Sequence, residues 1–126
     1  MTVCSKLPKE PGSAAAARRV LDQLDGHVDR EKLETARLLV TEVVTNAVRH
    51  VAREGQIDLN VALRDDALRV EVLDPGGGGF VPRRRGPDSP MDGKWGLHFL
   101  EVLSDRWGID SGHRTRVWFE LARDTA

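Results

Sequence analysis

The sequence predicts an α+β fold, a two-layer sandwich with three helices on one face of a mixed, mostly antiparallel sheet. Two patterns carry this prediction. Apolar residues recur at helical spacing from Leu33 to Val51. They then alternate with polar residues from Ile57 to Val72, as in a pair of strands with one buried face. The expected elements run strand, helix, helix, strand, strand, loop, helix, strand, strand, an order that favours helices gathered on one face.

The first part of the chain predicts an edge strand and two helices. Residues 2–7 alternate briefly before two prolines end the strand. Ser13 is the expected N-cap of a helix that runs until Gly26. Asp29 is expected to cap a second, longer helix that ends near Arg53, just before a Glu-Gly pair.

The second half predicts a hairpin, a long loop and a final helix with two strands. The pair Asp65-Asp66 supplies a two-residue turn between the alternating strands. About twenty residues from Asp74 onward are irregular, which in a compact domain indicates a working loop or disorder. A short amphipathic helix is expected at residues 97–103, followed by strands at 107–110 and 115–121.

Length and composition restrict the class of protein. With 126 residues, 40% of them hydrophobic, the chain is expected to form a single domain over residues 1–126. The net charge of -1 argues against a general polyanion binder, so we expect no direct contact with nucleic acid. The lone Cys4 excludes an intramolecular disulfide and a cysteine-cluster metal site. No apolar run approaches the ~20 residues that span a bilayer, so we expect a cytoplasmic protein without membrane contact.

The long helix carries a polar stripe beside its apolar face. Glu42, Asn46 and His50 are spaced by four residues and therefore lie along one edge of the helix. Asn is a weak helix former, which indicates that something other than helix formation selects it. The stripe is either a solvated helix flank or a site with a carboxylate base and an amide ligand.

Two glycine-rich segments are further candidate sites. Asp74 ends a strand and is followed by four glycines at 76–79, which permit positive φ and close approach to a ligand but also resemble a flexible linker. An Asp at a strand end can accept a hydrogen bond from an exocyclic amine. Gly93 and Gly96 open the last helix, where backbone N–H groups can hold phosphate or simply belong to a loop.

Taken together and in this order, the three sites resemble the boxes of the Bergerat-fold (GHKL-type) ATPases, which unite gyrase-type enzymes, certain chaperones and histidine kinases. The joint spacing makes the resemblance specific, and it spans a core of about residues 13–121. The matching positions are Glu42, Asn46, His50, Asp74, Gly76, Gly78 and Gly96.

Within that superfamily the chain is most similar to the anti-sigma-factor serine/threonine kinases. The similarity lies in the sequences at 41–50, 105–108 and 117–121 and in the short length. There is no room for a histidine-bearing dimerisation domain, which argues against a complete sensor histidine kinase. The resemblance implies a protein that binds a sigma factor, phosphorylates a serine or threonine on an antagonist protein and forms a homodimer.

The resemblance also implies roles for individual residues. Glu42 would be the catalytic base and Asn46 a ligand of Mg²⁺ on ATP. Asp74 would accept from the adenine amine, with Thr115 supporting it directly or through water. The loop at 75–95 would be the lid over the nucleotide. The other expected nucleotide contacts are Arg49, His50, Gly76, Gly78, Lys94, Gly96 and Leu97.

The third box, the glycine-containing segment at residues 93–97, differs from that of the relatives, which usually have Gly-Arg-Gly-Leu there. This chain has Lys94-Trp95-Gly96-Leu97, so one glycine is replaced and an indole stands where a flexible arm is expected, although Gly93 could substitute by a shift of one position. Lys94 could compensate as a point charge on phosphate. This departure leaves open a non-catalytic module that sequesters a partner, or a simple ATPase. The arginines at 83–85 fit a solvated charge run better than a phosphate contact.

Overall fold

The computed structural model of the chain describes residues 1–50, 54–76 and 97–123. A 3₁₀ turn, Asp22–Leu24, follows the first helix. The helices and strands, in chain order, are β1 (Thr2–Pro8), α1 (Ser13–Leu21), α2 (Arg30–His50), β2 (Gln56–Leu63), β3 (Ala67–Asp74), α3 (Leu97–Leu103), β4 (Arg106–Ser111) and β5 (Thr115–Ala122).

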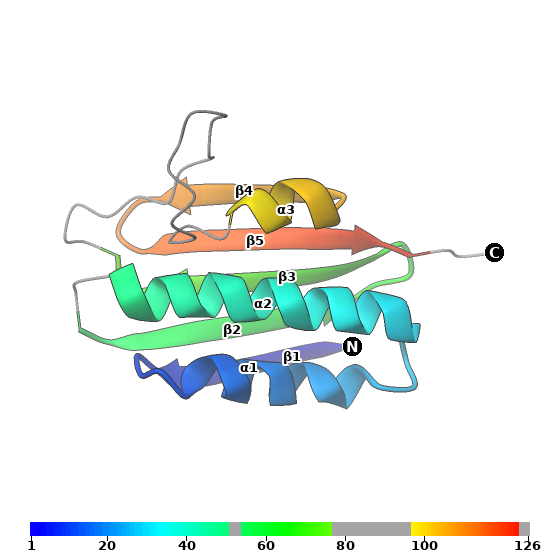
Figure 1. Cartoon of the computed structure of the whole chain (residues 1–126), viewed down its shortest axis with the longest axis horizontal. Coiled ribbons are helices and arrows are strands. Elements are labelled where there is room, and N and C mark those ends of the chain that lie inside the picture. The colour runs from blue at the N-terminus through cyan, green and yellow to red at the C-terminus, as the bar shows by residue number, and fades with distance from the viewer. Residues whose placement is uncertain (51–53, 77–96, 124–126) are drawn as a thin grey trace.

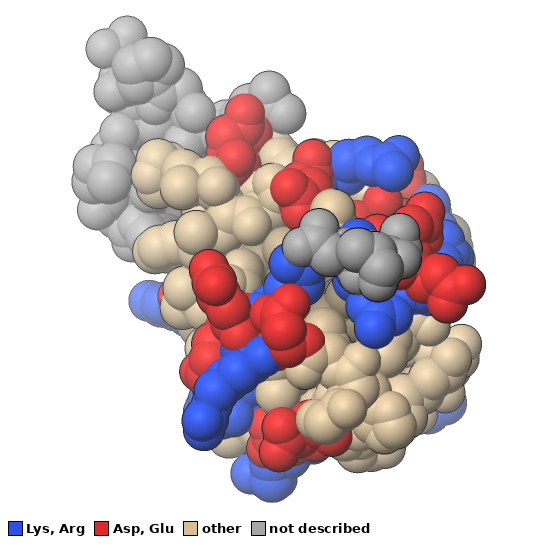
Figure 2. Space-filling model, turned by 90° about the vertical axis from the view of Figure 1, so that its right-hand side faces the viewer, with Lys and Arg blue, Asp and Glu red and all other residues tan. Residues whose placement is uncertain are grey.

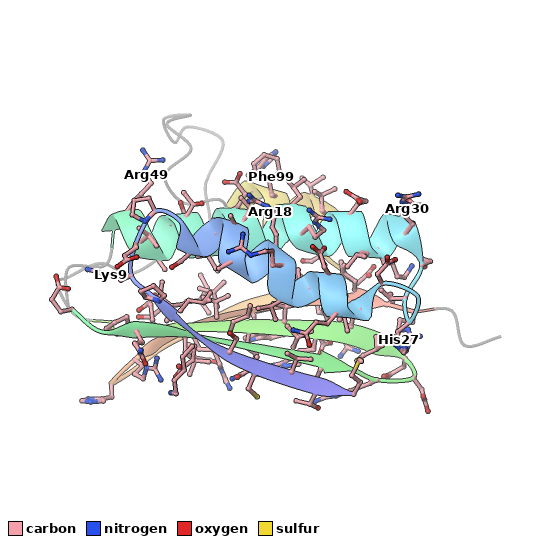
Figure 3. All side chains as sticks on the ribbon, turned by 90° about the horizontal axis from the view of Figure 1, so that it is seen from below. Lys9, Arg18, His27, Arg30, Arg49 and Phe99 are labelled. Carbon is pink, nitrogen blue, oxygen red and sulfur yellow. The ribbon has the colours of Figure 1, made fainter. Side chains whose placement is uncertain are left out.

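The described strands form one five-stranded sheet in the order β1-β2-β3-β5-β4, with every neighbouring pair antiparallel. The predicted α+β sandwich is confirmed, and the described sheet is antiparallel throughout rather than mixed. All three helices cover one face, which leaves two layers (Figures 1 and 3). As predicted, β1 lies at an edge and the hairpin joins β2 to β3 around residues 64–66.

The core lies between the sheet and α2. Strand residues alternate between buried and half-buried along β3 and β5, so that one face of each strand meets the helices. In β5, Val117, Phe119 and Leu121 are buried, as the alternation predicts. Leu100 anchors α3 in the same core, whereas Leu103 of that helix is 37% exposed. The predicted apolar face of α3 is therefore only partly buried.

The start of α1 differs from the prediction, whereas the start of α2 agrees with it. Ser13 is not the N-cap of α1: that position is Gly12, and no side chain caps the helix. The Ser13 hydroxyl instead donates to the Pro8 carbonyl, which ties the end of β1 to α1. At α2 the prediction is confirmed, because Asp29 Oδ1 accepts from the Lys32 backbone N–H at 2.8 Å. The expected end of that helix, at 51–53, lies outside the described residues.

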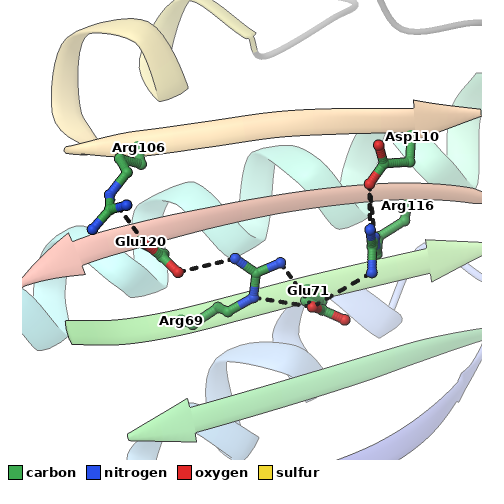
Figure 4. Close-up of polar contacts among 6 residues, drawn as sticks. All are labelled: Arg69, Glu71, Arg106, Asp110, Arg116 and Glu120. Carbon is green, nitrogen blue, oxygen red and sulfur yellow. Dashed lines mark hydrogen bonds and ion pairs between the residues drawn. The ribbon is translucent and has the colours of Figure 1, made fainter. Parts of the chain in front are cut away.

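The sheet face away from the helices is a network of paired charges centred on Arg69 (Figure 4). Its guanidinium lies 3.0 Å from Glu71 Oε2 and 2.9 Å from Glu120 Oε2. The same guanidinium stacks on the Trp118 ring, 4.3 Å from its centroid. That indole lies against Gly108 of β4, where a Cβ would come within 2.7 Å of the ring. The other ion pairs in the network are Arg106–Glu120, Arg116–Asp110 and Arg116–Glu71.

No helix among residues 1–50, 54–76 and 97–123 is long and apolar enough to cross a membrane.

We expect Arg69→Ala to lower the free energy of unfolding by about 1–3 kcal/mol, because it removes the shortest ion pairs of two partly buried carboxylates and leaves them the longer pairs with Arg106 and Arg116. Arg69 is 18% exposed at its side chain. Arg106, which is 74% exposed and pairs with the same Glu120, is the matched control. Arg106→Ala should change stability by no more than about 0.5 kcal/mol. Urea unfolding measures both, and equal effects would contradict this view of the network.

Candidate functional site

The described parts of the predicted site gather at one end of the sheet. The C-terminal half of α2, the end of β3 and the start of β5 lie together there (Figure 1). Asp74 is the last residue of β3 and is paired in register with Thr115, the first residue of β5. Both side chains are buried. The hairpin and β5 therefore bring together two polar residues that lie far apart in the sequence.

Asn46 is the strongest indication that α2 takes part in binding a ligand. Its side chain is only 7% exposed, and among the described residues its Nδ2 is a buried polar atom without a hydrogen-bond partner. An unsatisfied buried polar group costs about 1–3 kcal/mol, which a bound ligand would recover. A half-turn of the amide exchanges its oxygen and nitrogen, so the group can present an oxygen to a hard cation such as Mg²⁺.

Glu42 lies one turn before Asn46 on α2. Its side chain is half-buried, and within the described part of the chain its carboxylate makes no hydrogen bond or ion pair. A carboxylate that is partly shielded from water and not occupied by a cation can accept a proton from a substrate. The stripe predicted from the sequence thus lies at the border of the core, with Asn46 buried and Glu42 half-buried.

Asp74 is a buried carboxylate held by backbone N–H groups. It is 3% exposed, and its Oδ1 accepts from the Gly76 N–H at 2.7 Å. Burial raises the pKa of this carboxyl, while hydrogen bonds from the Gly76 and Thr115 backbones and the positive charge of Arg114 act in the opposite direction. The carboxylate is therefore positioned and has acceptor capacity for a donor on a ligand.

Gly76 has a conformation and a position that only glycine suits. Its φ is +72°, and a Cβ there would lie 3.1 Å from the His113 carbonyl oxygen. The positive φ turns its N–H back onto the Asp74 carboxylate, which closes a tight turn after β3. The glycine at this position is thus part of what positions Asp74.

Arg114 positions the same turn, and sequence reasoning did not identify it. Its Nη1 donates to Asp58 Oδ2 at 2.6 Å and its Nη2 to the Leu73 carbonyl at 3.1 Å, while Nε lies 3.4 Å from the Asp74 carbonyl. The hydrogen bond from Arg114 is the main cause that lowers the pKa of Asp58. All of these partners lie at least forty residues away in sequence. No local pattern could therefore have indicated the role of Arg114.

The remaining predicted residues are only partly described. Arg49 is exposed and projects from the end of α2 away from the sheet (Figure 3). The predictions that lie outside the described residues are those on Gly78, Arg83–Arg85, Gly93, Lys94, Trp95 and Gly96 and on the side chains of His50 and Leu97.

Comparison with known proteins places the chain in a family. A profile of the histidine kinase-like ATPase domain matches residues 7–121, nearly the whole sequence. The chain belongs to this family. The match includes α2, the end of β3 and the start of β5, so the residues gathered at that end of the sheet all lie in the family domain.

Two curated relatives are both named serine-protein kinase RsbW. The chain is 25% identical over 127 aligned residues to the serine-protein kinase RsbW of Oceanobacillus iheyensis, covering 89% of this chain and 80% of that protein. It is 26% identical to the serine-protein kinase RsbW of Bacillus subtilis over 115 residues, covering 79% and 72%.

A solved structure shares the fold. The crystal structure of the RsbU and RsbW domains of Rv1364c from Mycobacterium tuberculosis superimposes with a TM-score of 0.74 at 22% identity. The alignment covers 96% of this chain and 31% of that one, so the present sequence spans about a third of the solved chain. The solved chain therefore contains this fold as one part of a longer protein.

Asp74 predicts a pH dependence of stability. A carboxyl with a raised pKa stabilises the fold below its unfolded-state pKa, near 3.8, and this contribution is lost as the pH rises through the folded-state pKa. We therefore expect wild-type protein to lose unfolding free energy relative to Asp74→Asn as the pH rises from about 3 to about 7. Urea unfolding across this range measures the difference. Parallel curves would contradict the raised pKa, and Asp65→Asn on the exposed hairpin turn is the control.

Gly76→Ala should lower the free energy of unfolding by about 1–2 kcal/mol, because alanine is strained at positive φ and its Cβ meets the His113 carbonyl. Gly112, on the turn between β4 and β5, is the matched control, since nothing lies within 4 Å of a Cβ there. Gly112→Ala should stay within about 0.5 kcal/mol of wild type. Urea unfolding of the two variants tests the difference, and a neutral Gly76→Ala would refute the requirement for glycine.

Proposed function

We propose that this protein is an ATP-binding regulator that phosphorylates a serine or threonine on an antagonist protein and binds a sigma factor. The observation that carries the proposal is the buried Nδ2 of Asn46, which has no hydrogen-bond partner among the described residues and lies one turn after Glu42 on α2, at the same end of the sheet as the buried Asp74. Membership of the histidine kinase-like ATPase family and the likeness to proteins named serine-protein kinase RsbW support it.

The adenine would bind at the end of β3. Asp74 would accept a hydrogen bond from the exocyclic amine, and Thr115, in register with it, would support the carboxylate directly or through water. The turn at Gly76 and the glycine at 78 would allow the backbone to approach the base and ribose closely. Arg114 would act as a positioning residue, because it holds the backbone on which Asp74 stands.

The phosphates would lie along the C-terminal half of α2. Asn46 would hold a Mg²⁺ ion, which supplies charge neutralisation on the phosphate oxygens. Glu42 would take the proton from the attacking hydroxyl while that oxygen forms a bond to the γ-phosphorus and the bond to the bridging oxygen breaks, so that ADP leaves. Arg49, His50, Lys94, Gly96 and Leu97 are the further residues that we propose contact the phosphates.

Nucleotide binding is tested by titration calorimetry with ADP and Mg²⁺. Wild-type protein should bind saturably, and Asp74→Ala should bind about 10- to 100-fold more weakly, because it removes a hydrogen bond to a charged acceptor. Asn46→Ala should lose the dependence on Mg²⁺ while retaining adenine recognition. Asp66→Ala, on the exposed hairpin turn, is the control. Absence of saturable binding by wild-type protein would refute the proposal.

Phosphotransfer is tested with labelled ATP and candidate antagonist proteins. Glu42→Gln should reduce transfer on the order of 100- to 10,000-fold and leave nucleotide affinity nearly unchanged, because a general base acts only in the chemical step. Glu34→Gln, an exposed acidic residue on the same helix, should leave the rate unchanged. Equal transfer by the wild type and Glu42→Gln would exclude Glu42 as the base.

The altered third box favours one alternative, a nucleotide-binding module that sequesters a partner without catalysis. One glycine of the box is replaced there and Trp95 stands where a flexible arm is expected, and closure of a lid is needed for catalysis more than for binding. Nucleotide binding without label transfer to any antagonist would favour this module. Release of phosphate without a protein acceptor would favour a simple ATPase.

A further inference from the structure

A hollow lies between α2 and α3 at the end of the molecule opposite the site described above. Its volume is about 470 Å³, within the range of ~300–1,000 Å³ typical of ligand sites. The floor includes Leu103 and Leu121, and Thr35 of α2 lies on its wall. Figure 2 looks onto this end of the molecule and shows acidic and basic side chains interspersed beside uncharged surface.

The rim of the hollow is acidic. Three carboxylates, those of Asp29, Glu31 and Asp105, line it against the single ammonium group of Lys32. Lys32 already pairs with Asp29 at 3.6 Å, and Asp105 accepts from the Ala122 backbone N–H at 2.7 Å. Within the described residues the exposed Glu31 has no ion-pair partner. The rim thus carries an excess of negative charge with Glu31 free to bind a cation.

An exposed apolar line continues from the hollow along the helix layer. Leu38 follows Glu31 and Thr35 on the same side of α2, at i+7 and i+3, and is 43% exposed. Phe99 lies one turn before Leu103 on the same side of α3 and is 39% exposed. In Figure 3 the Phe99 side chain projects away from the sheet. We use the name α2/α3 groove for the acidic hollow together with the exposed apolar side chains of Leu38 and Phe99 on the two helices that line it.

We propose that the α2/α3 groove binds an amphipathic helix of a partner protein, with leucine-type side chains on its apolar face and Lys or Arg at the end over Glu31. Exposed apolar side chains on two helices would contact the apolar face, as in other helix-in-groove complexes. The acidic hollow would pair with the cations. The acidic hollow and the buried Asp74 lie at opposite ends of the sheet.

Charge argues for a different protein rather than a second copy of this chain. A two-fold contact through the groove would place the same acidic rim against itself or close to itself. Like charges brought together at an interface disfavour association. A basic helix has the complementary charge and therefore fits the rim better than another copy does.

The probe is a fluorescein-labelled peptide of about 15 residues with leucine at i, i+3, i+4 and i+7 and lysine elsewhere, titrated with the full chain in fluorescence anisotropy. We expect saturable binding that weakens as NaCl rises from about 0.05 to 0.5 M. A peptide of the same pattern with glutamate in place of lysine should not bind. Backbone amide shifts on binding should be confined to residues 31–38 and 99–105.

Two pairs of variants locate the contact. Glu31→Lys and Leu38→Ser should each weaken peptide binding about tenfold. The charge control is Glu10→Lys, at an exposed position outside the groove, and the apolar control is Val20→Ser, at a half-buried position on α1 outside the groove. Both controls should bind as wild type does. Thermal melts verify that each variant is folded.

Four results would overturn the proposal. They are absence of saturable binding, equal weakening by Glu10→Lys, amide shifts outside the groove, and self-association of the chain in sedimentation that Leu38→Ser abolishes. The last result would assign the groove to a second copy. ADP binding, measured on the same variants, should be unchanged, so failure of the groove and failure of the nucleotide site are distinguishable.

Discussion

The packing of α2 on the central strands is the constraint on which the rest of the structure depends. One face of this helix contacts β3, β5, α1 and α3, so its apolar residues bring every layer together. Because the helix is long and its buried face is continuous, the polar residues at the edge of that face are held at the border of the core. Asn46 is buried at this border, and among the described residues its Nδ2 has no hydrogen-bond partner.

Burial at this border has opposite consequences for stability and binding. Asp74 is removed from water, which raises its pKa and costs stability in the charged form, while two backbone N–H groups and the turn at Gly76 hold it in place. Asn46 carries an unsatisfied donor. Groups that are costly in the free protein and satisfied by a ligand are typical of binding sites. The rest of the core supplies the stability that makes these groups tolerable.

The open face of the sheet and the helix layer differ in how their charged side chains are paired. On the open face, Arg69 satisfies Glu71 and Glu120 and stacks on Trp118, so the charges are paired within the chain. Among the described residues, Glu31 at the rim of the α2/α3 groove has no ion-pair partner, and exposed apolar side chains lie beside it. A surface whose charges are paired internally gives a partner little to bind. A surface with free charge and exposed apolar area offers both.

The sequence by itself determined the element order, the hairpin and the faces of α2 and β5, because helical and strand periodicities are local and are set by which residues must be buried. It also placed Glu42, Asn46 and Asp74 as candidates through residue type and spacing. Only the tertiary structure decided that Gly12, and not Ser13, precedes α1, since the Ser13 hydroxyl finds the Pro8 carbonyl. Likewise, the role of Arg114 and the α2/α3 groove depend on residues that approach only after the sheet and helices pack, and local patterns contain no information about such contacts.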